Sequence, residues 1–166
     1  MTDSLTAACA LFALALAVAE RAHAGDPLDC LAPGADCTLA ELASQAGVFV
    51  GAADDAIRRD EVLADALVRE FNSMTSENEL KWGFLTSAPG EYDFVPGDFA
   101  VDFAEANGLR MRGHTLIWGR LNGPPDWLEG ELDAAEDRAA RLRELMGEHI
   151  ATVVGRYAGH IEQWTS

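Results

Sequence analysis

Residues 71–82 read FNSMTSENELKW, a short run with apolar residues followed directly by a cluster of polar side chains. We predict a short strand over FNSMT (71–75). Glu77, Asn78 and Glu79 follow at once, together with Lys81, which is the only lysine among the 166 residues. A strand that ends in a cluster of polar side chains is typical of α/β proteins, which build their sites at the carboxyl ends of parallel strands.

Strand and helix patterns alternate on both sides of this stretch. Apolar runs predict strands at 47–53 (GVFVGAA), 71–75, 109–114 (LRMRGH) and 160–165 (HIEQWT). Helical spacing of apolar residues predicts helices at 54–70, 97–107 and 133–157, with a long loop after the third strand. Asn107-Gly108 is a good stop signal for the second helix.

Regular alternation of this kind predicts an α/β fold with a parallel sheet and right-handed crossovers. Two architectures fit, a doubly wound sheet and the first half of an eight-stranded barrel. Glu77 and Lys81 follow the second strand, and His114 and Trp118 lie at the end of the third, which favours the barrel. No glycine-rich phosphate loop follows the first strand, which weakens the nucleotide-binding alternative. We therefore predict about four βα units, the first half of a (β/α)8 TIM barrel.

The composition limits the partners. Lys and Arg total 12 against 28 Asp and Glu, which gives a formal charge of −16 and a pI near 4.4. A surface with this much negative charge repels phosphate backbones and anionic lipids. We therefore expect neither a nucleic-acid partner nor a membrane partner.

The amino-terminal residues resemble a leader. LTAACALFALALAVA (5–19) is an apolar run, and Ala22-His23-Ala24 forms an A-x-A cleavage pattern before Gly25. A membrane anchor is the alternative, but the run is shorter than the roughly 20 residues of a spanning helix. MTDS at the start lacks the positive charge of a signal peptide. We predict a signal peptide at 1–24, a lead-in at 25–46, a partial barrel at 47–166, and a secreted protein.

Two cysteines remain after such a cleavage. Cys30 and Cys37 either pair and close a short loop, as exported proteins allow, or stay as free thiols. Neither has the thiol and histidine neighbours of a zinc site, so we expect no metal and no cofactor.

The polar clusters suit the binding of vicinal hydroxyl groups. Ionised glutamates accept hydrogen bonds, lysine donates them, and asparagine and neutral histidine do both. Indole rings such as that of Trp118 match the C–H face of a sugar. Simpler explanations exist: ENELK is most often a solvated turn with Glu–Lys pairing, Trp82 and Trp127 favour packing, and His114 fits a structural role equally well.

TSENELKW (75–82) and LRMRGHTLIW (109–118) together resemble glycoside hydrolase family 10, the endo-1,4-β-xylanases. GEYDF, FAEANG and HIATVVGRYAGHIEQW add to the resemblance, which runs from Gly47 to Trp164. It implies a (β/α)8 barrel that hydrolyses internal β-1,4-xylosidic bonds of xylan with retention, by means of two glutamates. It implies sugar-binding roles for Glu77, Asn78, Lys81, His114 and Trp118.

The sequence departs from the family pattern in two places. WGRLNGPPDW (118–127) lacks the usual histidine and the sugar-binding glutamine, for which Asn122 is the only stand-in we suggest. After Trp164, Thr165-Ser166 replaces the start of the motif that carries the acid/base glutamate, and the nucleophile belongs to a later strand. We therefore predict no catalytic residue in these 166 residues, and no xylanase activity for them alone.

Two further expectations follow from half a barrel. Open edges of the sheet favour self-association of the chain. The rival function is a non-catalytic protein that binds xylan or xylo-oligosaccharide, as a remnant or as a half-barrel that assembles with another chain.

Overall fold

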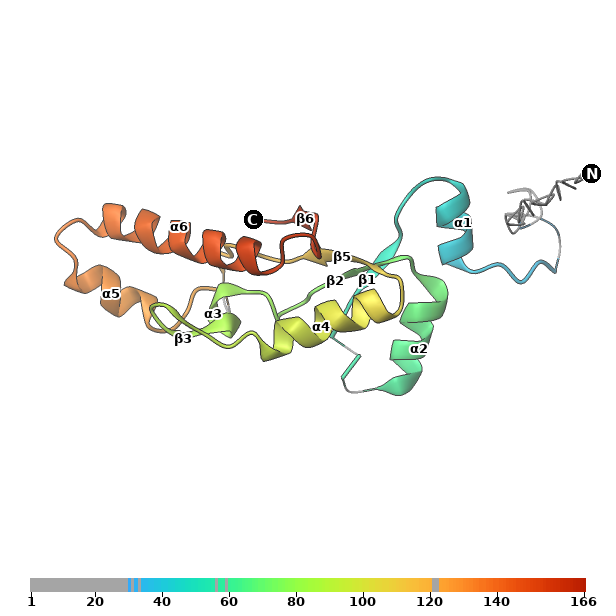
Figure 1. Cartoon of the computed structure of the whole chain (residues 1–166), viewed down its shortest axis with the longest axis horizontal. Coiled ribbons are helices and arrows are strands. Elements are labelled where there is room, and N and C mark those ends of the chain that lie inside the picture. The colour runs from blue at the N-terminus through green and yellow to red at the C-terminus, as the bar shows by residue number, and fades with distance from the viewer. Residues whose placement is uncertain (1–29, 31, 33, 56, 59, 121–122) are drawn as a thin grey trace, which may run out of the picture.

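A computed structural model describes residues 30, 32, 34–55, 57–58, 60–120 and 123–166 (Figure 1). Its centre is a four-stranded parallel sheet in the order β1-β2-β5-β6. The strands are β1 (Gly51–Ala53), β2 (Ser73–Thr75), β5 (Arg110–Gly113) and β6 (Gln163–Trp164). Each lies within a strand predicted from the sequence and is shorter than it.

Helices connect consecutive strands of this sheet. They are α2 (Glu61–Glu70) after β1, α3 (Trp82–Leu85) and α4 (Val95–Ala106) after β2, and α5 (Leu128–Ala134) and α6 (Arg138–Arg156) after β5. The end of α4 agrees with its predicted stop, because Asn107 is its C-cap and Gly108 takes a φ of 66°. Glycine adopts that left-handed conformation without steric cost.

The strand order identifies the architecture. Spatial order follows chain order, whereas a doubly wound sheet reverses direction at a switch point. Leu67 of α2, Ala104 of α4 and Val153 of α6 join one apolar cluster with Met74 of β2 and Met111 of β5. All three helices therefore cover the same face, as in a barrel. The predicted half of a (β/α)8 barrel is confirmed.

The two faces of the sheet differ in polarity. Met74 and Met111 are at most 3% exposed on the helix-covered face, and burial of one such side chain contributes about 1.5–3 kcal/mol. Side chains point alternately to the two faces of a strand. Ser73, Thr75 and Arg112 therefore lie on the other face, where they are half-buried or exposed.

The predicted helix at 133–157 starts too early, because its first two residues belong to a separate helix, α5. α5 begins inside the predicted loop and ends at Ala134, and α6 begins at Arg138. Asp137 separates them: its backbone is extended and its carboxylate accepts the Ala140 N–H at 2.9 Å, which caps α6. The two helices lie side by side (Figure 1), and Arg141 of α6 pairs with Glu131 of α5.

The predicted helix at 54–70 begins later than expected. Its N-cap is Asp60, whose carboxylate accepts the N–H groups of Val62 and Leu63. Asp54 and Asp55 precede the helix and do not start it. The side chain of Asp54 instead bonds to the turn after β2.

A hairpin in the second crossover was not predicted. Its strands are β3 (Thr86–Ala88) and β4 (Glu91–Tyr92), which pair antiparallel. Gly90 has a φ of 77° in the turn. Strands of two and three residues are too short to show alternation, so the Pro89-Gly90 turn was the only signal.

The lead-in contains the short helix α1 (Leu39–Gln45), which Thr38 and Glu41 start with a capping box. Cys30 and Cys37 form a disulfide, so the first of the two alternatives holds. The predicted signal peptide at 1–24 lies outside the described residues. Within the described helices, none combines the length and apolarity that a bilayer-spanning segment needs.

Candidate functional site

The candidate site lies at the carboxyl ends of the parallel strands. Asp54 follows β1, Ser76 and Glu77 follow β2, His114 follows β5, and Thr165 follows β6. The register aligns Ala53 with Thr75 and Thr75 with Arg112, while Gly113 is level with Trp164. These ends therefore form one row, and the loops that leave them share one side of the sheet.

The turn after β2 folds around Lys81. The Lys81 ammonium donates to Asn78 Oδ1 at 2.9 Å, and the Lys81 N–H donates to the Asn78 carbonyl oxygen at 2.9 Å. Lys81 therefore closes a compact loop and also fixes the orientation of the Asn78 amide. An amide oxygen that accepts from lysine leaves the NH2 group to face a ligand.

A row of contacts joins this turn to the loop after β5. The Lys81 ammonium lies 5.7 Å from the centroid of the Trp118 ring, within cation–π range. The Trp118 ring meets the His114 ring edge to face, with centroids 5.4 Å apart. The structure therefore brings together four of the five predicted site residues, Asn78, Lys81, Trp118 and His114.

Glu77 is the fifth predicted site residue, and a hydrogen bond of its backbone N–H fixes its position. Its N–H donates to Asp54 Oδ1 at 2.7 Å. Its side chain is half-buried, and its carboxylate has no hydrogen bond to any other described residue. This carboxylate is thus available to accept hydrogen bonds from a ligand.

His114 is held from the end of β6. Its Nδ1 lies 2.8 Å from Thr165 Oγ1. Burial, and then the charges of Lys81 and Arg112, lower the pKa of His114. A neutral imidazole has one donor and one acceptor nitrogen, so His114 offers the ligand a hydrogen-bonding group without a charge.

Asp54 is the residue of this region that we did not predict from the sequence. Burial, opposed by the Glu77 N–H and reinforced by the Glu79 charge, raises the pKa of Asp54 from 3.8 to about 7. The available signal was position: Asp54 follows the first strand just as Glu77 follows the second. We interpreted it instead as the start of a helix.

Trp82 packs in the core, which agrees with the simpler of its two explanations. It is 4% exposed and stacks on the buried His149 ring at a centroid distance of 4.9 Å. Trp127 meets its ring edge to face at 5.9 Å. Trp82, Tyr92 and Trp127 line a hollow of about 260 Å³ away from the strand ends. Asn122, the suggested stand-in for a glutamine, lies outside the described residues.

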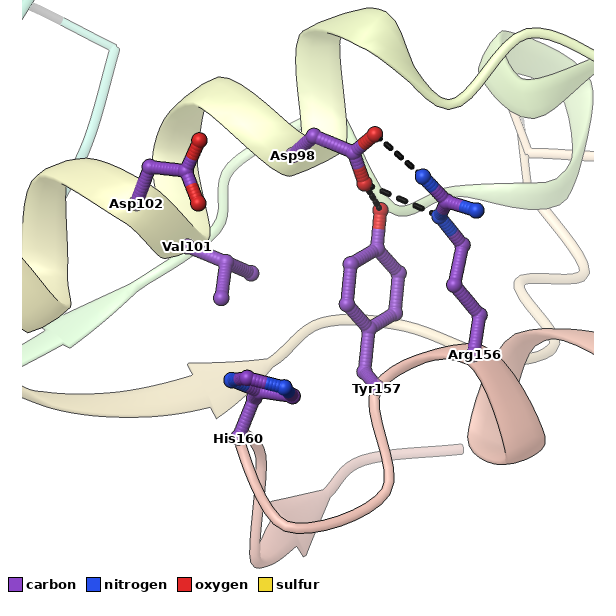
Figure 2. Close-up of a pocket in the computed structure, with 6 residues that line it drawn as sticks. All are labelled: Asp98, Val101, Asp102, Arg156, Tyr157 and His160. Atoms are coloured by element: carbon purple, nitrogen blue, oxygen red, sulfur yellow. Dashed lines mark hydrogen bonds and ion pairs between the residues drawn. The ribbon is translucent and has the colours of Figure 1, made fainter.

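A hollow of about 350 Å³ lies between α4 and the end of α6 (Figure 2). Three of its polar side chains bind one another: Arg156 Nε donates to Asp98 Oδ1 at 2.9 Å, and the Tyr157 hydroxyl donates to the same oxygen at 3.1 Å. Arg156 thereby lowers the pKa of Asp98. This junction joins two helices and is separate from the strand ends.

Among the described residues, no three His, Cys, Asp or Glu side chains are grouped as metal ligands.

Comparisons with known proteins identify the family. Residues 38–165 match the family model described as Glycosyl hydrolase family 10. The "Beta-1,4-xylanase" of Dictyoglomus thermophilum is 43% identical over 98 residues, which are 59% of this chain and 26% of that protein. "Endo-1,4-beta-xylanase 3" of Hypocrea jecorina is 34% identical over 116 residues, 70% of this chain and 31% of that one.

Solved structures give the same result. The native xylanase 10B from Thermotoga maritima superposes with a TM-score of 0.68 at 31% identity, over 77% of this chain and 39% of that one. Xylanase 10B from Thermotoga petrophila in complex with xylobiose also gives 0.68 at 31% identity, over 80% and 40%.

The chain thus spans between about a quarter and two fifths of the length of these relatives. The matched family and these named relatives are hydrolases, so the rival prediction of a non-catalytic binding protein is not favoured. A family match that covers residues 38–165, most of the chain, decides the assignment: the chain belongs to glycosyl hydrolase family 10.

Proposed function

We propose that this chain is part of an endo-1,4-β-xylanase and that Glu77, Asn78, Lys81, His114 and Trp118 bind xylose units of its substrate. The observation that carries the proposal is the connected row from Asn78 through Lys81 and Trp118 to His114. The names of the relatives and the xylobiose in the Thermotoga petrophila structure support the substrate class.

The chemistry of the row fits a neutral sugar. Lys81 and the Asn78 amide donate to hydroxyl oxygens, while the Glu77 carboxylate accepts from hydroxyl groups. The Trp118 ring supplies an apolar face for ring C–H groups. Charge-assisted hydrogen bonds of this kind contribute about 1.5–3 kcal/mol each.

The proposed reaction of the whole enzyme is retaining hydrolysis of internal β-1,4-xylosidic bonds, which requires one carboxylic acid as acid/base and one carboxylate as nucleophile. Among the carboxyl groups at the described strand ends, we assign neither role to Asp54, Glu77 or Glu79. A polypeptide of these 166 residues is therefore expected to bind xylo-oligosaccharides without hydrolysing them.

Calorimetric titration of the folded 166-residue chain with xylotriose tests the proposal. Maltotriose, an α-linked glucose trimer, serves as the control for sugar binding of low specificity. Saturable binding of xylotriose, with none of maltotriose at the same concentrations, is expected. Binding of neither sugar, or of both equally, contradicts the proposed substrate class. Release of reducing ends from xylan above a blank would show that catalytic groups are present after all.

We further propose that residues 1–24 act as a signal peptide, that the catalytic region begins near Gly47 after a lead-in, and that the protein is secreted. The A-x-A pattern before Gly25 supports this. Amino-terminal sequencing of protein recovered from the culture medium should begin at Gly25. Recovery of the chain only from cells, with Met1 still present, would contradict secretion.

A further inference from the structure

Asp54 is a buried acid next to the proposed sugar-binding turn. It is 3% exposed, and its Oδ1 accepts the Glu77 N–H at 2.7 Å. Its second oxygen, Oδ2, is buried without a hydrogen-bond partner in the described part of the chain. A buried oxygen without a partner is costly, so its environment requires a physical explanation.

Glu79 supplies that explanation from the turn. Its carboxylate is held beside Asp54, because Glu79 accepts the N–H of Asn78 while Asp54 accepts the N–H of the preceding residue, Glu77, and the Glu79 charge raises the pKa of Asp54. Two ionised carboxylates can only accept hydrogen bonds and repel each other, whereas a proton on Asp54 makes it a donor to Glu79. One proton shared between the two acids therefore removes both the repulsion and the missing partner.

The same two acids hold the backbone of the turn. Asp54 Oδ1 accepts the N–H of Glu77, and Glu79 Oε2 accepts the N–H of Asn78 at 3.0 Å. Glu79 Oε2 also lies 3.5 Å from the Oγ of Ser76, which is fully buried. Two successive N–H groups are thus fixed by two acidic side chains, one from the end of β1 and one from within the turn.

We propose that Asp54 and Glu79 are a proton-sharing pair of positioning residues, which hold the backbone at Glu77 and Asn78 in the geometry that binds the sugar. The inference rests on the proposed function, because Glu77 and Asn78 are proposed sugar ligands. It also assigns Glu79 a role that the sequence left open: Glu79 acts on the turn and does not bind the sugar itself.

The pair makes sugar binding dependent on pH. The groups that face Asp54 are the Glu79 carboxylate and the Glu77 N–H from the turn, and Asp55 follows it in its own loop. Burial and the Glu79 charge place the pKa of Asp54 at about 7. Below that pH the pair shares a proton. Above about pH 7 both carboxylates are ionised and repel each other, which weakens the contacts that fix the backbone N–H groups of Glu77 and Asn78.

Hydrogen exchange of individual backbone amides, followed by NMR on the full 166-residue chain, tests the positioning without any ligand. At pH 5.5, Asp54→Ala should accelerate exchange of the Glu77 amide at least about tenfold. Asp54→Asn should leave it protected, because the amide side chain still accepts from Glu77 and donates to Glu79. Asp65→Asn, on the exposed side of α2, is the matched control and should change neither amide.

Glu79→Ala is the complementary variant and should expose the Asn78 amide. If Asp54→Ala does not fold, Glu79→Ala and the pH profile decide the question. In that profile, xylotriose affinity of the wild type should fall about fivefold between pH 6 and 8.5, and Asp54→Asn should abolish the fall.

Three results would each overturn the proposed positioning role of Asp54 and Glu79. They are an unchanged exchange rate of the Glu77 amide in folded Asp54→Ala, an unchanged exchange rate of the Asn78 amide in Glu79→Ala, and the same pH profile of xylotriose affinity in wild type and Asp54→Asn. Absence of xylotriose binding in a wild-type chain whose amides respond as expected would instead overturn the proposed function and leave the positioning role intact.

Discussion

The Lys81 ammonium lies 5.7 Å from the ring centroid of Trp118, and this contact joins the turn after β2 to the loop after β5. It links two segments that are far apart in the sequence into one surface at the strand ends. Because the same ammonium also holds Asn78, a change at Lys81 reaches both segments.

Trp118 should contribute a stacking surface for the sugar. Trp118→Ala removes the ring and its contact with Lys81, so xylotriose affinity should fall by about 1–2 kcal/mol, as calorimetry measures it. Phe99→Ala removes an exposed ring on α4 and is the matched control. Equal xylotriose affinities of Trp118→Ala and Phe99→Ala would contradict stacking of the sugar on the Trp118 ring.

Asp98 should stabilise the packing of α4 against α6. Asp98→Asn weakens the pairing with Arg156, and both side chains are partly exposed, so we expect a loss of only about 1 kcal/mol in the free energy of unfolding. Its pKa is lowered by Arg156 in the folded state, so the contribution is present near neutral pH. It should disappear as the pH falls through that lowered value.

Urea unfolding of wild type and Asp98→Asn at several pH values checks this expectation. The difference between them should shrink in acid. Asp102→Asn, an exposed change on the same helix, should follow the wild type. A difference between Asp98→Asn and wild type that stays constant into strong acid would contradict the assignment.

His149 should make the fold sensitive to acid. The ring is fully buried between Trp82 and Tyr92, and burial lowers its pKa from 6.5 to about 4. The unfolded chain therefore binds more protons between these values, so stability should fall as the pH drops from 6.5 to 4.

His149→Phe, which keeps a stacked ring, should remove that part of the pH dependence. The free energy of unfolding, measured in urea from pH 4 to 7, gives the comparison. Asp54 changes stability in the opposite sense, because a raised carboxyl pKa favours folding at low pH and loses its effect as the pH rises to about 7. If His149→Phe follows the wild type through pH 4–6.5, His149 is not the acid-sensitive group.

The 166-residue chain should self-associate. Within the described residues, β1 and β6 each have a neighbouring strand on one side only. Phe49, just before β1, is 58% exposed. An unpaired edge pairs readily with another strand, so light scattering after size-exclusion chromatography should show a mass that rises with concentration. A constant monomer mass up to high concentration would contradict this expectation.

The order of strands and the row of site residues could be predicted because each depends on local patterns. The patterns FNSMT and LRMRGH predict strands, and polar residues follow each strand directly. Because the two strands are parallel neighbours, the topology of the sheet brings Lys81 near Trp118. Asp54 could not be assigned in the same way. Its burial depends on the turn after β2, more than 20 residues later in the chain.

The predicted starts of two helices were wrong for a related reason. The apolar spacing near Ile57 is loosely helical, but the cap that starts α2 is Asp60. Likewise, the apolar pattern predicts a helix from residue 133, but the cap that starts α6 is Asp137. Caps depend on a single side-chain bond, which periodicity does not reveal.

The most direct test of the proposed site is the xylotriose affinity of Lys81→Ala, measured by calorimetry beside Arg143→Ala, an exposed cation on α6 that serves as the matched control. We expect about a tenfold or greater loss for Lys81→Ala, because it removes a charged donor, the hold on Asn78 and the contact with Trp118. Arg143→Ala should bind like the wild type. Equal affinities of folded Lys81→Ala and wild type would contradict a sugar-binding site at these strand ends.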